Sequence, residues 1–262
     1  MMLETVLTIS LATSVIIALL LCLSPLLERY SARWRYFVWL IIAVRLVIPV
    51  NIRLPQAPVR ITMPEQVVVI RAGGPTAVDV MTEEERSEAA RYEASSLNYA
   101  PVMSLSELFT CIWIAGTAVF LIVHIAGYIR FRLRIRPCLR DTERNNVKIC
   151  PGISAPLAVG FIRPVILLPD MVYTDEELGF ILAHEVMHIK RGDLWYKLLL
   201  VAANAVHWFN PLVYLMVNRA ERDLEYCCDY MVVKNKDIEY RKKYSMTILK
   251  HTRNKGRDGG SK

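Results

Sequence analysis

Three long stretches without charged side chains constrain the fold of this chain more than any other feature of its sequence. Residues 5–27 hold no acidic, basic or histidine side chain, and residues 108–128 and 198–217 each hold one histidine. Each stretch is long enough to cross a hydrocarbon layer of about 30 Å. Since 54% of the 262 residues are hydrophobic, the sequence predicts an integral membrane protein and excludes a soluble domain, a disordered chain and a small disulfide-linked scaffold.

A fourth, shorter apolar stretch and the charge distribution define the expected topology. Residues 36–50 are predicted to form a second span, in which Arg45 either faces other helices, a carboxylate or water, or extends to one membrane interface. Residues 28–35 and 130–148 are rich in arginine, whereas residues 51–106 carry seven acidic side chains against five arginines. Because basic flanks stay on the cytoplasmic side, we expect the N-terminus and residues 51–106 outside, and everything after residue 128 inside.

The net charge of +7 is explained by the same topology. Most basic side chains lie in residues 130–148 and 234–262, where anionic lipid headgroups contribute about 1 kcal/mol per basic residue. Membrane lipids are therefore an expected partner, and no recognition motif indicates direct binding of nucleic acid. The six cysteines include no C-x-x-C pair, which favours buried free thiols over disulfides or a cysteine metal site.

The residues after 148 have the pattern of a compact α+β domain. Residues 155–169 contain two short apolar runs separated by Gly160 and Arg163–Pro164, which predicts two strands joined by a turn. A T-x-x-E capping box at Thr174 then predicts a helix from about Asp175 to Arg191 that ends near Gly192.

That helix contains the sequence His184-Glu185-Val186-Met187-His188. Because positions four apart share one face of a helix, both histidines can bind one zinc ion through their ring nitrogens. Glu185 then lies beside the metal, where it is suited to move a proton as a general base, and zinc lowers the pKa of a bound water to about 7. The alternative is a chance match, which for a chain of this size is on the order of one in a hundred.

A catalytic zinc requires a further protein ligand, and a second predicted helix offers one. This helix is expected to begin with Asn210 as its cap and Pro211 in its first turn, and to continue to about Val233. Glu225 and Asp229 share one of its faces, so Glu225 is assigned as third ligand and Asp229 as the outer carboxylate that orients a histidine. The alternative is an ordinary solvated acidic face.

This assignment also constrains residues 198–217. If they crossed the bilayer as one helix, Glu225 would lie outside and both histidines inside, and one ion could not bind all three. We therefore predict a break at Asn210–Pro211 and a helical hairpin partly sunk in the inner leaflet. The chain then has three transmembrane helices rather than four.

Several motifs together resemble the bacterial beta-lactam sensor-transducers of the BlaR/MecR type, whose membrane portion is a gluzincin-type zinc peptidase. The matching segments are 36–49 (YFVWLIIAVRLVIP), 155–169, 184–193 (HEVMHIKRGD), 207–211 (HWFNP) and 222–229 (RDLEYCCD), and residues 244–249 (YSMTIL) are a fainter match. The resemblance implies a bacterial plasma membrane location, zinc as cofactor, His184, His188 and Glu225 as its ligands, and Glu185 as the catalytic residue. It also implies a substrate-binding edge formed by Ala155, Pro156, Leu157, Ala158, Val159 and Gly160.

The expected fold is an α-helical membrane protein with a cytoplasmic α+β gluzincin-like zinc peptidase domain. The expected parts are residues 1–50, two spans with a basic cytoplasmic loop; 51–106, an extracellular loop; 107–128, the third span; 129–252, the peptidase domain; and 253–262, a disordered basic tail. The sequence has no S-x-x-K acylation motif of a penicillin-binding sensor, so we expect the peptidase portion of the family without that domain.

The expected function is a membrane-embedded zinc metalloendopeptidase in a transmembrane signalling pathway. The resemblance implies regulation of antibiotic resistance, with a cytoplasmic repressor or the chain itself as substrate and a separate sensor protein as a further partner. Two alternatives remain: a zinc protease of membrane quality control, which would cleave many misfolded proteins, and a non-catalytic or truncated signalling subunit with a structural zinc.

Overall fold

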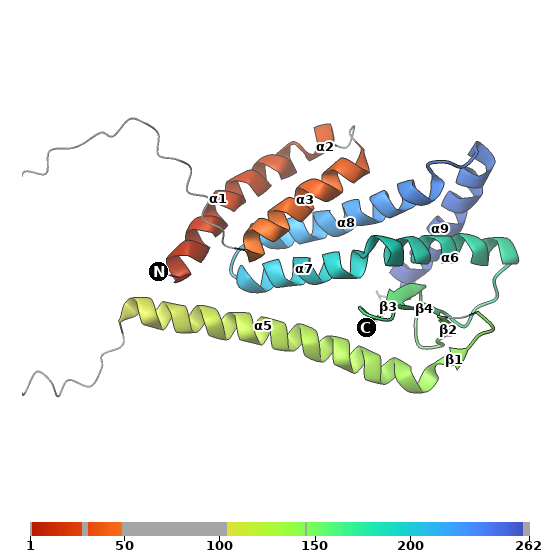
Figure 1. The fold of residues 1–262 in the computed structure, drawn as a ribbon, viewed down its shortest axis with the longest axis horizontal. Coiled ribbons are helices and arrows are strands. Elements are labelled where there is room, and N and C mark those ends of the chain that lie inside the picture. The colour runs from red at the N-terminus through yellow and green to blue at the C-terminus, as the bar shows by residue number, and fades with distance from the viewer. Residues whose placement is uncertain (1, 28–30, 49–103, 145, 259–262) are drawn as a thin grey trace, which may run out of the picture. The chain divides into compact units, whose positions relative to one another are not determined.

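The computed structural model describes residues 2–27, 31–48, 104–144 and 146–258, so most of the expected extracellular loop lies outside the described part of the chain. The described residues are mostly helical, with one small sheet (Figure 1). The elements are α1 (Met2–Cys22), α2 (Ser24–Leu27), α3 (Ala32–Val47), α5 (Leu105–Ile135), a 3-10 turn (Arg136–Cys138), β1 (Arg140–Asp141), β2 (Val147–Ile149), β3 (Leu157–Val159), β4 (Val165–Leu168), α6 (Asp175–Arg191), α7 (Asp193–Val206), α8 (Pro211–Val233) and α9 (Ile238–Asp258).

Two of the described helices are long and apolar enough to cross a membrane, namely Leu3–Cys22 and Leu105–Cys138. Apolar side chains also cover their exposed surfaces, among them Leu11 on α1 and Ile122 on α5. Helix α3 has 16 residues, fewer than a perpendicular span needs, so the second of the three expected spans stays a prediction. Arg45 is half-buried on α3.

Helices α1, α3, α7 and α8 pack around one apolar core, in which α3 lies beside α8 (Figure 1). Apolar side chains recur along these helices every three or four residues, which is the spacing of a single buried face. The buried residues of α8 in this core are Val213, Met216, Ala220 and Leu224. The core thus holds the helix that carries Glu225 against the amino-terminal part of the chain.

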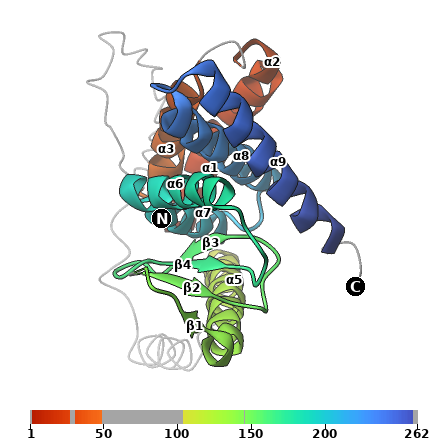
Figure 2. The same ribbon diagram turned by 90° about the vertical axis from the view of Figure 1, so that its right-hand side faces the viewer.

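The sheet has the strand order β1-β2-β4-β3, with β2 and β4 parallel and the other two pairs antiparallel. Successive residues of a strand point to opposite faces. Leu167 of β4 therefore packs toward Ile135 at the end of α5, whereas Ile166 and Leu168 pack toward Ile181 of α6. The sheet lies beneath α6, with β3 at its edge (Figure 2).

The predicted strand–turn–strand of residues 155–169 is confirmed by β3 and β4, which pair antiparallel. Gly160 leads into the turn with φ of +105°, and a Cβ there would lie 2.8 Å from the Arg163 carbonyl oxygen. A residue with a side chain would be strained at this position.

The bounds of α6 agree with the prediction, and its ends show why. Thr174 accepts from the Glu177 backbone N–H, and the Glu177 side chain accepts from the Thr174 N–H, which completes the capping box. Gly192 ends the helix in a left-handed conformation with φ of +71°, the usual role of glycine at this position.

The break between α7 and α8 also agrees with the prediction. The chain turns at residues 207–210, and α8 starts at Pro211 with the Asn210 side chain accepting from the Leu212 N–H. The Asn210 amide in turn donates to Ser10 and Ser14 of α1. His207 is buried in this turn, with Nε2 3.1 Å from the Leu46 carbonyl oxygen, so it serves the packing of the bundle.

Helix α9 was not predicted as a separate element. It packs on α6 through Phe180 and Tyr244, with support from ion pairs of Lys243 with Glu176 and of Lys250 with Glu177. Its backbone continues to Asp258, into the stretch for which the sequence predicts a disordered tail.

Candidate metal centre

Helix α6 presents His184 and His188 on one face, and their Nε2 atoms lie 3.0 Å apart. The second nitrogen of each ring is held from outside. His188 Nδ1 lies 2.7 Å from Asp193 Oδ2, and His184 Nδ1 lies 2.8 Å from the Tyr244 hydroxyl and 3.1 Å from Asp229 Oδ1. Such partners fix the orientation of the ring and the position of its proton.

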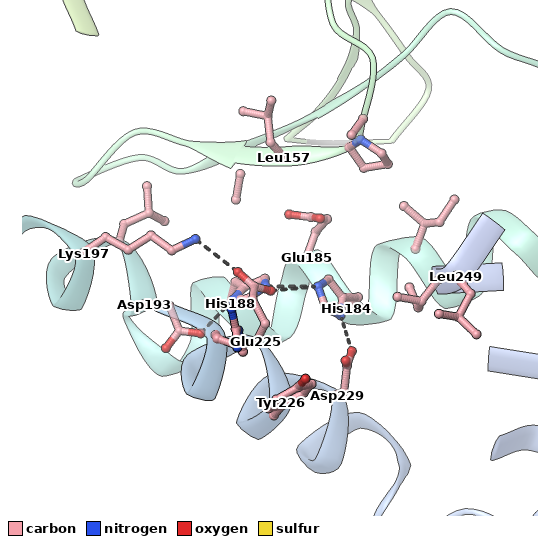
Figure 3. Close-up of a pocket in the computed structure, with 17 residues that line it drawn as sticks. Leu157, His184, Glu185, His188, Asp193, Lys197, Glu225, Tyr226, Asp229 and Leu249 are labelled. Carbon is pink, nitrogen blue, oxygen red and sulfur yellow. Dashed lines mark hydrogen bonds and ion pairs between the residues drawn. The ribbon is translucent and has the colours of Figure 1, made fainter. Parts of the chain in front are cut away.

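Helix α8 brings Glu225 to the same point. Its Oε2 lies 3.1 Å from His188 Nε2 and 3.7 Å from His184 Nε2, while Oε1 lies 3.2 Å from Lys197 Nζ (Figure 3). Ligands of a tetrahedral zinc at its usual bond lengths are separated by about 3.3 Å. The three atoms that the sequence assigns to zinc are therefore brought together at separations close to those of a zinc site.

The hydrogen-bond network indicates that these three atoms are all acceptors. Tyr244 donates its hydroxyl proton to Asp229, so its oxygen accepts from His184 Nδ1; Asp193 accepts from His188 Nδ1 in the same way. With both protons on Nδ1, the two Nε2 lone pairs and the Glu225 carboxylate face one another. Such a group is stable only around a cation or shared protons, and two imidazoles with one carboxylate are a donor set that suits zinc.

The electrostatics of the metal-free cluster lead to the same conclusion. Burial lowers the pKa of both histidines, but hydrogen bonds to Asp229 and Glu225 raise the pKa of His184 to about 10. Those to Asp193, Cys228 and Glu225 raise the pKa of His188 to about 12. Burial would raise the pKa of Glu225, yet its bonds to the two histidines hold it below the ordinary value. The cluster therefore carries protons when no metal is bound, and a metal has to displace them.

Cys228 lies close enough to offer a second donor set. Its Sγ and one ring nitrogen of each of His184 and His188 lie within 4.8 Å of one another. The thiol is fully buried and donates to the His184 carbonyl oxygen at 3.6 Å. The sequence predicts that Cys227 and Cys228 are buried free thiols. That Cys228 lies close to the two histidines is seen only in the tertiary structure.

A cavity of about 500 Å³ opens on the cluster and is lined by β3, α6, α7, α8 and α9. Of the expected substrate-binding edge, Ala155, Pro156, Leu157 and Ala158 line it. Val159 instead points into the core on the far face of the sheet, and Gly160 forms the turn that follows. The upper wall is thus the start of β3 and the loop before it, with Leu157 above the cluster (Figure 3).

Glu185 faces this cavity from a different side. It is buried on α6, and its carboxylate points toward β3 and away from the Nε2 atoms of the two histidines (Figure 3). Burial raises its pKa, and the nearby histidines oppose that rise. A carboxylate whose pKa is raised accepts a proton more readily than an ordinary one, which suits a general base beside a cavity.

Three residues of the site were missed by sequence reasoning. Asp193 and Tyr244 hold the outer nitrogens of the histidines, and Lys197 pairs with Glu225. Asp193 closes the HEVMHIKRGD segment, and Tyr244 begins the fainter family match at residues 244–249. Both therefore had a signal in the sequence, although neither was assigned a role, whereas Lys197 had none.

Two histidines four residues apart on one helix, a glutamate between them and a carboxylate from a second helix form the arrangement of metallopeptidases. Comparison with known families agrees with this class. The chain belongs to the BlaR1 peptidase M56 family, whose model matches residues 4–260.

Curated relatives match a large part of the chain. The protein named Regulatory protein BlaR1 of Bacillus licheniformis is 30% identical over 177 residues, which are 60% of this chain and 30% of the relative. The Methicillin resistance mecR1 protein of Staphylococcus aureus is 24% identical over 195 residues, 67% of this chain and 33% of the relative. The chain thus spans about a third of the length of these relatives.

Proposed function

We propose that this chain is a zinc metalloendopeptidase of the gluzincin type in which His184, His188 and Glu225 bind the ion. The observation that carries the proposal is the convergence of two Nε2 atoms and Glu225 Oε2 within 3.0 to 3.7 Å. Asp229 and Asp193 orient the two histidines from outside. We assign Glu225 rather than Cys228 as third ligand because its carboxylate oxygen lies 3.1 and 3.7 Å from the two Nε2 atoms. The Cys228 thiol is also near the histidines, but it donates to the His184 carbonyl oxygen.

The side chains around the cavity have separate roles in peptide hydrolysis. Zinc, when bound, polarises the scissile carbonyl and acidifies a water molecule. Glu185 accepts the proton of the attacking water and passes it to the leaving amine, for which its buried position and raised pKa are suited. Among the described strands β3 has a partner on one side only, so its other edge is free to hold an extended peptide by backbone hydrogen bonds.

The proposed membrane arrangement has three spans, with residues 1–50 and 107–128 supplying them, and an active site on the cytoplasmic side. Two apolar helices of spanning length and the reversal of the chain at residues 207–210 support it. Because the chain reverses, α8 runs back toward His184 and His188 of α6. Glu225 and these two histidines would then share one side of a bilayer. We propose that α7, the turn and the start of α8 form a hairpin sunk in the inner leaflet.

The proposed biological role is cleavage of a cytoplasmic or juxtamembrane protein in a signalling pathway. The names of the relatives, a regulatory protein and a methicillin resistance protein, support a link to antibiotic-resistance regulation. The substrate that we propose is a repressor-like protein or the chain itself. A separate sensor protein and membrane lipids are the further partners that we propose.

Metal content is the first test of the ligand assignment. We expect about one zinc per purified, detergent-solubilised chain, with the metal lost or sharply weakened in Glu225→Ala and retained in the matched variant Cys228→Ala. Loss in Cys228→Ala with retention in Glu225→Ala would instead establish the histidine–cysteine set. A wild-type chain without zinc would contradict the peptidase proposal and favour a non-catalytic subunit.

The role of Glu185 is tested by separating metal binding from cleavage. Glu185→Gln should retain zinc and lose at least about 100-fold in cleavage rate, whereas His184→Ala should lose both. Cleavage of the chain itself and of a quenched fluorescent peptide library, in membranes without other proteases, provides the assay. Full activity of Glu185→Gln would overturn its assignment as the proton carrier.

A further inference from the structure

Residues in the first turns of α3 contact α8 and the junction of α6 and α7, the two parts of the chain that carry the proposed metal ligands. These contacts lie outside the cavity. We propose that Arg35, Tyr36 and Trp39 are positioning residues that hold the ligand-bearing parts of α6 and α8 in register, an inference that rests on the proposed function. Two separate sets of contacts carry it, one to α8 and one to the junction of α6 and α7.

The contact with α8 runs through Asp223. This carboxylate is fully buried, with Oδ1 2.9 Å from Arg35 Nε, while Oδ2 accepts from the Trp39 indole N–H at 2.9 Å. Residues two apart on a helix point about 200° away from one another, so Asp223 faces α3 while Glu225 faces the cavity. Holding Asp223 therefore fixes the rotation of α8 about its axis, and with it the place of Glu225.

The contact with the α6–α7 junction runs through Arg191. Its guanidinium lies 4.8 Å from the centre of the Tyr36 ring, and Nη2 lies 3.4 Å from Asp193 Oδ1. The other oxygen of Asp193 holds His188 Nδ1. Tyr36 is itself fixed by stacking on Tyr196 of α7, with ring centres 4.7 Å apart. A continuous series of contacts thus leads from Tyr36 to a proposed ligand.

Arg191 also joins the two sets of contacts. Its Nη1 donates to the Leu224 carbonyl oxygen at 3.4 Å, on the turn of α8 that lies between Asp223 and Glu225. Displacement of α3 would therefore disturb His188 and Glu225 together.

The burial of the Arg35–Asp223 pair argues for a positional role rather than simple packing. The two side chains are 9% and 0% exposed, and removing charges from water is costly unless their geometry is well satisfied. Apolar side chains would join α3 to α8 without that cost, as they do elsewhere in the same core. Hydrogen bonds are directional, so they fix the rotation of α8 relative to α3, which apolar contacts do not.

The test compares metal binding in two pairs of full-chain variants. Tyr36→Leu removes the ring beneath Arg191, whereas Tyr36→Phe keeps it; Asp223→Asn alters the buried carboxylate, whereas Glu221→Gln alters an exposed one on the same helix. Zinc affinity is measured by competition with a chromophoric chelator, and ligand geometry by the visible spectrum of the cobalt(II) form. The unfolding temperature of each metal-free variant is recorded alongside.

We expect Tyr36→Leu and Asp223→Asn to bind zinc about 10- to 100-fold more weakly, the range found for outer partners of metal ligands, and to change the cobalt spectrum. Glu221→Gln should match the wild type, and Tyr36→Phe, which keeps the ring but loses the hydroxyl beside Arg191, should lose less affinity than Tyr36→Leu. If Asp223→Asn does not fold, Trp39→Phe, which removes one N–H donor, takes its place. Wild-type affinity and spectrum in Tyr36→Leu and Trp39→Phe would overturn this inference alone, whereas a wild type that binds neither metal would overturn the proposed function as well.

Discussion

Each histidine of the candidate metal centre is oriented through its outer nitrogen, but by different means. His188 contacts the buried carboxylate of Asp193 directly, whereas His184 contacts both Asp229 and the hydroxyl of Tyr244, which itself donates to Asp229. The single hydroxyl of Tyr244 thus links a proposed ligand, an outer carboxylate and the helix α9. This arrangement makes Tyr244 the residue at which the contribution of α9 to the site can be measured.

Replacement of Tyr244 by phenylalanine should weaken zinc binding about tenfold or more, the effect of losing an outer partner of a ligand. The ring would remain packed against Phe180, so the unfolding temperature should change little. Competition with a chelator measures the affinity, and Tyr240→Phe, on the same helix and stacked on Tyr244, is the control. Equal zinc affinity in Tyr244→Phe and the wild type would show that Asp229 orients His184 without the hydroxyl.

At the scale of single elements, the two helices that carry the proposed ligands are defined by local capping. Helix α6 has a complete capping box, three acidic residues in its first turn and a left-handed glycine at its end, and α8 starts with an asparagine cap followed by proline. These features lie within one turn of the helix ends, so they operate before any tertiary contact forms. Two predictions concern these ends.

The Glu177 carboxylate at the amino-terminal end of α6 should make the stability of the fold decrease at acid pH. The hydrogen bond from Lys250 and that from the Thr174 N–H hold the pKa of Glu177 below its ordinary value of 4.5. The folded pKa is thus below the unfolded one, so the ionised carboxylate stabilises the fold above about pH 4.5, and this contribution is lost as the pH falls through the folded pKa.

Glu177→Gln keeps an acceptor for the cap but loses the charge. The free energy of unfolding at pH 7 should fall by up to about 1 kcal/mol, and the difference from the wild type should be smaller at pH 3, below the unfolded pKa. Denaturant titrations at both pH values in detergent provide the measurement. A difference that persists unchanged at pH 3 would show that the charge of Glu177 is not its cause.

The turn between α7 and α8 depends on Asn210, which caps α8 and donates to two serines of α1. Asn210→Ala should lower the free energy of unfolding by about 1 to 3 kcal/mol, because it removes the cap and leaves buried serine hydroxyls without this partner. Asn210→Ser retains a capping oxygen and should lose less. Equal stability of the alanine variant and the wild type in denaturant titration would contradict this role.

At the scale of the whole molecule, the reversal of the chain at residues 207–210 decides which groups can meet. Helix α8 runs back along α3 and α7 instead of continuing away from them, and Glu225 therefore reaches the histidines of α6. We propose that in a membrane all three proposed ligands then lie on one side, and the basic residues after residue 128 favour the cytoplasmic side.

Labelling of single cysteines tests the proposed orientation. In a variant whose native cysteines are replaced by alanine, a cysteine at Ser95 should react with a membrane-impermeant maleimide on intact cells. A cysteine at Glu143, which is exposed in the structure, should react only after the membrane is opened. The reverse pattern would invert the topology and place the metal centre outside.

Features that depend only on neighbouring residues could be predicted from the amino-acid sequence. The apolar stretches, the ends of α6, the start of α8 and the pair of strands around Gly160 follow from hydrophobic length, capping and turn chemistry, all of which act within a few positions. The same locality explains why His184, Glu185 and His188 were recognisable, and why Glu225 and Asp229 could be nominated from their shared helix face.

Contacts between residues far apart in the chain could not be predicted in this way, because they depend on how the helices pack. Tyr244 lies 60 positions from His184 and Asp223 lies 188 from Arg35, and no periodicity or motif relates such pairs. The same holds for Cys228 beside the histidines and for the turn of Val159 away from the cavity, since both depend on which faces of α8 and β3 are covered by their neighbours. Local rules specify what each segment becomes, whereas the packing of whole helices specifies which side chains meet at the metal centre.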